Sequence, residues 1–189
     1  MNEKMKNPWR GLQAYREGEI LYGRDEDILR LSGQVLSDTD TVLYGKSGIG
    51  KSSLLNAGVI PAARRKGVFP VSIRLEHRAG ARSYVGQVQY ALEEAGVAVR
   101  PAHPTVSREA SFWEFVHCNR FYIGEERQKL LVIFDQFEEI FTLQQDIQRK
   151  RQFFEEMADL LNDIMPRSIA EISGRKEKET EAAEISDAG

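Results

Sequence analysis

The feature that most constrains this chain is the run Gly45–Ser53, which reads G-K-S-G-I-G-K-S-S. Gly45, Gly50, Lys51 and Ser52 occupy the four fixed places of G-x-x-x-x-G-K-[ST], the pattern of a phosphate-binding loop. Glycines let the backbone turn so that successive N–H groups point at phosphate oxygens. The lysine brings a positive charge to the β- and γ-phosphates, and the serine hydroxyl can ligate Mg²⁺. The run therefore predicts a strand–loop–helix unit that binds a nucleotide.

The residues around the run decide whether it is a chance match in a glycine-rich turn. Thr41–Tyr44 is a short β-prone segment before the loop, and Ser53–Ala57 after it is compatible with a helix. Strand, loop and helix is the context that the pattern requires, so we favour a real site. The nucleotide-binding residues expected from the run are Gly45, Lys46, Ser47, Gly48, Ile49, Gly50, Lys51, Ser52 and Ser53.

Composition narrows the class of protein. A chain of 189 residues is long enough for one domain with its own core. The net charge of −3 argues against nucleic acid as the main ligand. The single cysteine, Cys118, excludes an internal disulfide framework and is expected to be a buried, inert thiol rather than a nucleophile. The longest apolar run, Leu130–Phe134, is too short to span a bilayer, and Met1–Pro8 has no apolar core of a signal peptide, so we expect a cytoplasmic protein without a membrane partner.

Hydrophobic periodicity divides the chain into a lead-in with a helix (residues 1–36), a nucleotide-binding core (37–165) and a polar tail (166–189) that we expect to be poorly ordered. Strands alternating with helices predict an α/β, three-layer domain with a mainly parallel sheet. The expected elements are a helix over 25–36 with Ile28, Leu29, Leu31 and Val35 on its apolar side, strands at 41–44, 69–75 and 130–135, helices over 83–95, from Ser111 and through 153–164, and a loop at 96–105.

A second motif supplies a carboxylate. Leu130–Asp135 is a continuous apolar run that ends in an acid, which is typical of a buried parallel strand whose carboxyl end faces a ligand. A hard cation such as Mg²⁺ prefers oxygen ligands. Runs of this kind are common by themselves. In a chain that also has the complete phosphate-binding loop Gly45–Ser53, known as a Walker A motif, this run is interpreted as a Walker B strand. We therefore expect Ser52 and Asp135 to hold the metal.

Hydrolysis also requires a group that orients or deprotonates the attacking water. Many ATPases of this type place a glutamate directly after the Walker B aspartate, where this chain has Gln136. Glutamine can orient water but is a poor base. Glu138 and Glu139 follow three and four residues after Asp135 and are the other candidate catalytic residues. The alternative is that both are acids of a first helical turn.

Three segments resemble one family. Asn7–Tyr15 is similar to the N-P-[YF]-x-G-L lead-in of the bacterial novel-STAND NTPases, and Leu21–Asp27 is similar to their hhGRxxE element. Val132–Glu139 resembles their Walker B strand with its D-Q-F-E-E extension. The resemblance covers residues 7–162, and the order of the three motifs is its most specific part.

The resemblance implies further site residues and a role. In relatives the hhGRxxE element lies beside the nucleotide base, so Gly23 and Arg24 become candidate nucleotide-binding residues, although Asp27 stands where glutamate is usual. The family implies an AAA-like, ATP-controlled signalling switch in which ADP holds a closed form and ATP opens it. Effector and sensor domains on the same or other chains, and a homo-oligomer, are the implied partners.

The resemblance also suggests that the NTPase domain is truncated before the strand that bears the sensor-1 residue. Arg167–Gly174 lies at roughly its place but is too polar for a central strand. We therefore expect an ATP/ADP-Mg²⁺ binding module that hydrolyses ATP weakly or not at all.

Three other functions stay open. A small-molecule kinase needs an arginine-bearing lid, for which Arg78, Arg82 and Arg108 are available without a motif around them. A GTPase would carry an N-K-x-D motif, which the sequence lacks. A non-catalytic interaction fragment would bind no nucleotide. Nucleotide binding is the simplest discriminator: a preference for ATP and ADP supports the switch module, a preference for GTP supports a GTPase, and no binding supports an interaction fragment.

Overall fold

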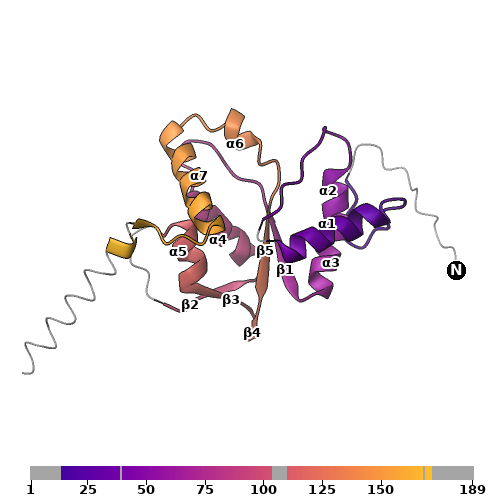
Figure 1. Ribbon diagram of the computed structural model, residues 1–189, viewed down its shortest axis with the longest axis horizontal. Helices are drawn as coiled ribbons and strands as arrows, with labels where there is room; N and C mark the ends of the chain where they lie inside the picture. Colours follow the sequence, from indigo (N-terminus) through magenta and orange to yellow (C-terminus); the bar gives the residue numbers. More distant parts are fainter. Residues whose placement is uncertain (1–13, 39, 104–109, 168, 172–189) are drawn as a thin grey trace, which may run out of the picture. The chain divides into compact units, whose positions relative to one another are not determined.

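The computed structural model describes residues 14–38, 40–103, 110–167 and 169–171 (Figure 1). The chain divides into two compact units. The first holds residues 1–70 and 129–132, and the second holds residues 71–128 and 133–189. The boundaries fall within β1 (Val68–Ile73), at the start of β5 (Lys129–Phe134) and within β5, and these two strands pair in a small parallel sheet.

The first unit is built on α1 (Asp25–Ser37). Three acids in its first turn favour the helix because they meet the positive end of its dipole. Leu31 is buried in a cluster with Leu54 and Val59, and Ile28 and Val35 pack against that cluster. The expected apolar side is wrong at Leu29, which is 77% exposed, because a position one residue after Ile28 is turned about 100° around a helix.

A continuous helical stretch follows the loop. It consists of α2 (Lys51–Leu54), a π-helical turn η1 (Leu55–Val59) and α3 (Ile60–Arg65). In the π turn the Ile60 N–H donates to the Leu55 carbonyl, five residues back. Pro61 lies one residue later, has no N–H, and its ring would crowd the carbonyl four residues earlier. The wider turn relieves that crowding without ending the helix.

One glycine sets how closely the two helical segments of this unit approach each other. A Cβ atom on Gly58 of the π turn would lie 2.5 Å from Cγ1 of Ile28 on α1. Such a separation is far below a van der Waals contact, so only glycine allows this packing. The helix that follows the phosphate-binding loop is thereby held directly against α1.

The segment before the loop differs from expectation. Residues 41–44 are not a strand, although their composition is β-prone. No backbone pairing joins them to another described segment. Leu43 packs against the Leu31–Leu54–Val59 cluster, but Val42 and Tyr44 are 78% and 88% exposed. Propensity favours an extended backbone, whereas a strand also requires a neighbour to complete its hydrogen bonds.

The second unit confirms the helix starts read from the sequence. Ser83 caps α4 (Tyr84–Glu94) by accepting a hydrogen bond from the Gly86 N–H. Ser111 opens α5 (Phe112–Cys118) with the expected cap, because its hydroxyl accepts from the Glu114 N–H at 3.2 Å. Two further helices follow β5, namely α6 (Glu139–Thr142) and α7 (Ile147–Leu161). Ile164, expected on the last helix, lies beyond its end.

An antiparallel sheet in the second unit was not foreseen. It has the order β2 (Ala98–Pro101), β3 (Asn119–Ile123) and β4 (Glu126–Arg127). The expected loop is therefore wrong at residues 98–101, while its last two residues lie outside the described ones. Pro101 suggested a loop, but it pairs with Asn119 at the end of an edge strand, where a missing N–H is tolerated.

The core of the second unit is an aromatic cluster centred on Phe153 of α7, which is 1% exposed. Five ring centroids lie 4.7 to 6.3 Å from it, those of Tyr84, Phe112, Phe134, Phe137 and Phe154. Phe134 and Phe137 flank Asp135 in the chain, so this packing fixes the turn after β5.

β5 and the residues near the end of the described chain differ from the sequence-based expectation. β5 itself is only half-buried, not buried as expected, and β1 is its one neighbour among the described strands. Residues 167 and 169–171 are helical, with Ile169 buried. The rest of the polar tail lies outside the described residues. The fold is thus α/β with a small parallel sheet, and a three-layer arrangement stays a prediction.

Candidate nucleotide site

The loop has the backbone that its glycines were expected to allow. Gly48 and Gly50 have φ angles of 80° and 90°, a left-handed region that strains other residues. Gly50 is the residue that precedes α2, so the helix begins at Lys51. The expected loop-to-helix transition is confirmed. Loop residues 45–49 are exposed. The Ile49 N–H donates to the Lys46 carbonyl at 3.4 Å, whereas the N–H groups of residues 45–48 donate to no other described residue and are accessible to a phosphate.

Lys51 lies across its own loop. Its Nζ donates hydrogen bonds to the carbonyl oxygens of Gly45 at 2.8 Å and Lys46 at 3.2 Å. The contacts hold the ammonium group beside the glycine-rich turn rather than letting it extend into solvent. A positive charge at this place complements phosphate oxygens that approach the loop.

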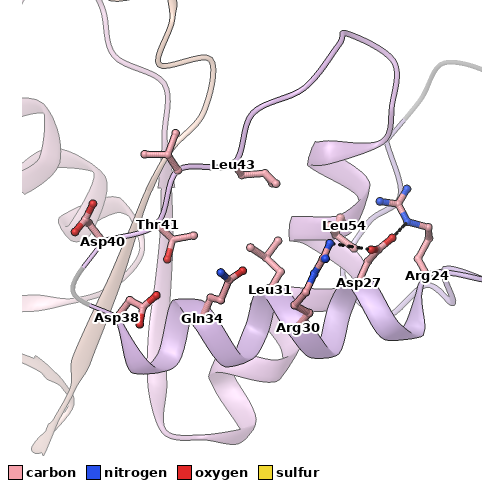
Figure 2. A pocket seen from close by; sticks show the side chains of 11 residues that line it. Arg24, Asp27, Arg30, Leu31, Gln34, Asp38, Asp40, Thr41, Leu43 and Leu54 are labelled. Atoms are coloured by element: carbon pink, nitrogen blue, oxygen red, sulfur yellow. Dashed lines mark hydrogen bonds and ion pairs between the residues drawn. The ribbon is translucent and has the colours of Figure 1, made fainter.

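Arg24 is a residue outside the run that the structure brings to the loop. Its Nη1 donates to the Ile49 carbonyl at 3.3 Å, and its Nε donates to Asp27 Oδ2 at 2.5 Å. Asp27 also contacts Arg30, at 3.5 Å (Figure 2). The aspartate that departs from the usual glutamate therefore still orients the arginine. Gly23, with φ of 71°, supplies the turn that leads into α1.

A hollow of about 450 Å³ lies between α1 and the extended segment before the loop (Figure 2). This hollow was not predicted from the sequence. Its signal was the helical spacing of the polar residues 27, 30, 34 and 38, which places them on one side of the helix. The lining residues are Arg24, Asp27, Arg30, Leu31, Gln34, Asp38, Asp40, Thr41, Val42, Leu43 and Leu54.

Ser53 has a structural partner. Its buried Oγ accepts a hydrogen bond from the Tyr15 N–H at 3.1 Å. The end of the lead-in is thereby fixed to the helix that follows the loop. The hydroxyl keeps its own O–H as a donor, and the expected nucleotide contact of Ser53 stays a prediction. The first part of the lead-in, Asn7–Gln13, lies outside the described residues.

The second part of the expected site is the turn after β5. The Asp135 N–H donates to the Ile73 carbonyl at 2.9 Å, and Asp135 Oδ1 accepts from the Gln136 N–H at 3.0 Å. Gln136 has a φ of 53°, which is uncommon for a residue other than glycine. Strained backbone of this kind occurs often at functional sites. Asp135, Gln136 and Glu138 are exposed.

Glu139, unlike the other candidate residues of this turn, forms an ion pair with an arginine side chain. Arg74 Nε donates to Glu139 Oε2 at 2.8 Å, and Arg74 Nη2 donates to Glu139 Oε1. The hydrogen bonds from Arg74 hold the pKa of Glu139 below its usual value. Both oxygens of this carboxylate are thus committed, unlike those of Glu138.

The structure brings together the loop, Lys51 and Arg24 in the first unit, and Asp135 to Glu139 in the second unit. The joining of these two groups around one nucleotide stays a prediction. Two arginines considered for a kinase lid have local partners: Arg78 pairs with Glu76, and Arg82 lies over the Tyr90 ring. Arg108 lies outside the described residues.

Other side chains in the second unit give no sign of a site. Burial raises the pKa of the Cys118 thiol, which opposes a role as a nucleophile. Within the described ranges, no three histidine, cysteine, aspartate or glutamate side chains are grouped as metal ligands. A Mg²⁺ site of the expected kind uses only one or two protein ligands.

Comparison with protein families identifies the chain. Residues 8–179 match the family described as Novel STAND NTPase 1. The chain belongs to this family of novel STAND NTPases. The match includes both the phosphate-binding loop and the turn after β5, and it confirms the resemblance read from the three motifs. Comparisons with curated proteins and with solved structures gave no match.

Membership in the novel STAND NTPases indicates a nucleotide-binding module. It agrees with the sequence of the loop and with the left-handed glycines found there. In the part of this NTPase that the structure describes, none of the helices combines the length and apolarity needed to cross a membrane.

Proposed function

We propose that this chain is the ATP/ADP-Mg²⁺ binding module of a STAND-type signalling switch and that, by itself, it hydrolyses ATP weakly or not at all. The observation that carries the proposal is the Walker A loop. Lys51 donates hydrogen bonds across it to the first two loop carbonyls, and Arg24 donates to the Ile49 carbonyl. The lysine and the exposed backbone of the loop suit a polyphosphate, and Arg24 beside Ile49 suits the neighbouring base. Membership in the novel STAND NTPases supports the same assignment.

The residues present fit a magnesium nucleotide. The backbone of Gly45–Ser53 and the ammonium of Lys51 would hold the phosphates, and Gly23 and Arg24 would lie beside the base. Ser52 and Asp135 would supply a hydroxyl and a carboxylate, the oxygen ligands that Mg²⁺ prefers. When bound, the metal would offset the negative charge of the phosphates.

Weak hydrolysis follows from the residues after the Walker B aspartate. Gln136 replaces the usual glutamate, and Glu139 is held by Arg74. Phosphoryl transfer depends on positioning and on charge stabilisation, and a missing arginine finger alone costs about 10³–10⁵ in rate. Glu138 is the acid best placed to orient water, because its carboxylate is exposed and accepts no hydrogen bond from another described residue.

Calorimetric titration with ATP, ADP and GTP tests the binding function. We expect ATP and ADP to bind in preference to GTP, and Lys51→Ala to weaken ATP binding by about 1.5–3 kcal/mol, the worth of hydrogen bonds to a charged group. The matched control is Lys66→Ala, which removes the same charge from an exposed position after α3. Unchanged affinity in Lys51→Ala would contradict the assignment. A preference for GTP would favour a GTPase, and no binding would favour an interaction fragment.

Single-turnover hydrolysis with excess protein tests the second part of the proposal. We expect a rate far below about one per second, because the site lacks a glutamate next to Asp135. Glu138→Gln should lower whatever rate remains. A rate near one per second in the unmodified chain would show that the isolated site is complete.

A further inference from the structure

Arg74 and Glu139 come from segments that are distant in sequence but adjacent in the second unit. Arg74 directly follows β1, and Glu139 begins α6. The hydrogen bond from the Asp135 N–H to the Ile73 carbonyl places the residues after β1 beside the residues after β5. The guanidinium then meets the Glu139 carboxylate through two hydrogen bonds, Nε to Oε2 and Nη2 to Oε1. Two-point contact fixes the direction of the carboxylate as well as its position.

The two partners differ in their access to solvent. The side chain of Glu139 is 20% exposed, whereas that of Arg74 is 59% exposed. Glu139 is anchored by its place at the start of α6, whose Ile140 is fully buried. The pair can therefore open by movement of the arginine into water while the glutamate keeps its place.

The pair with Arg74 reduces the ability of Glu139 to act as a base or to bind a water molecule. A carboxylate that accepts two hydrogen bonds from a guanidinium is a weaker base, and it has fewer lone pairs left for a water molecule. Arginine keeps its charge at all pH values relevant to a protein, so deprotonation cannot release Glu139. Glu138 carries no such restraint and is exposed.

We propose that Arg74 is a positioning residue that holds Glu139 out of the hydrolytic reaction, so that the Arg74–Glu139 pair limits ATP turnover until it opens. The proposal rests on the function proposed above and adds a reason why the rate of ATP hydrolysis at that site is low. It assigns different tasks to the two adjacent glutamates: Glu138 acts while the pair is closed, and Glu139 becomes available when Arg74 leaves.

The test is single-turnover hydrolysis of MgATP by the full chain and four variants. Arg74→Gln removes the restraint and should raise the rate roughly tenfold or more, within the range for a newly available water-orienting acid. The double variant Arg74→Gln, Glu139→Gln should lose that gain. Arg74→Lys keeps the charge but not the two-point contact, so it should give a smaller gain. Arg100→Gln is the matched control, because Arg100 makes the same kind of two-point pair with Glu125 elsewhere in the unit.

Affinity for ATP is measured in parallel by calorimetry, and circular dichroism checks that each variant folds. ATP binding with no rate increase in Arg74→Gln and Arg74→Lys would overturn this inference and leave the binding function intact. A slower Arg74→Gln would also overturn it, since that result is expected if the guanidinium itself stabilises the phosphate. A gain that persists in the double variant would show that Glu139 is not the acid released. Absence of ATP binding in the unmodified chain would instead defeat the proposed function.

Discussion

At the scale of single residues, Asp135 has two separable tasks. Its Oδ1 accepts the Gln136 N–H, and its carboxylate charge is expected to hold Mg²⁺. Asparagine keeps a carbonyl oxygen for the first task but loses the charge needed for the second.

We therefore predict that Asp135→Asn weakens ATP binding in Mg²⁺ by on the order of tenfold, or about 1.4 kcal/mol, and has little effect in EDTA. Calorimetric titration under the two conditions measures the difference, and EDTA serves as the internal control. An equal loss in both would show that the aspartate acts only on the structure of the turn.

Residues within one motif could be predicted from the sequence, and contacts between distant residues could not. The helix that begins at Lys51 and the Ser111 cap depend on spacings of a few residues, and both are found as expected. Arg74 and Glu139 are 65 residues apart, and a chain with many charges offers no local sign of which arginine meets which glutamate. The family resemblance singled out Arg24 as a candidate beside the base, but nothing in the sequence indicated its contact with the loop.

At the scale of elements, the approach of the π turn to α1 is the most demanding packing in the first unit. A methyl group at Gly58 would overlap Ile28, so we predict that Gly58→Ala destabilises the protein by about 1–3 kcal/mol, as overpacking does. Urea unfolding followed by circular dichroism measures the free energy of unfolding.

Gly33→Ala is the matched control for this prediction. A Cβ at Gly33 meets nothing within 4 Å, and alanine is the better helix former, so stability should be unchanged or rise by up to about 1 kcal/mol. Ile28→Ala removes all three atoms that the new methyl group would meet, so Gly58→Ala should cost less stability in the Ile28→Ala background than in the unmodified chain. Equal stability of the Gly58 variant and the unmodified chain would show that the two helical segments are free to separate.

Helices were predicted better than strands because their signals are local. α1 and α4 are marked by a hydrophobic period of 3.6 and by residues at their ends. The pairing of β2 with β3 joins residues about twenty apart, and proline at the end of β2 concealed it. At residues 41–44 the error was the reverse, because a strand was predicted and is not found. Their composition suits a strand, but no described strand pairs with them.

At the scale of the whole molecule, the sequence indicated the α/β class and the family, because both follow from the order of motifs along the chain. It gave no indication of the two compact units, because their boundaries fall within strands or at the start of a strand. Composition marks domain boundaries only where the connecting segments are polar or flexible.

The extended segment at residues 41–44 has a consequence for the protein in concentrated solution. Among the described residues, no backbone group pairs with those beside exposed Val42 and Tyr44, so another chain can add to this extended segment through hydrogen bonds. We predict that Val42→Lys reduces the light scattering that develops as the protein is concentrated, because a lysine on an edge opposes such addition.

Val116→Lys is the control, since it makes the same charge change at an exposed apolar position on helix α5. Equal scattering by both lysine variants would attribute the effect to net charge alone. If only the edge variant stays clear, the segment that leads into the phosphate-binding loop also sets the colloidal stability of the protein, and samples for nucleotide titration are best prepared dilute.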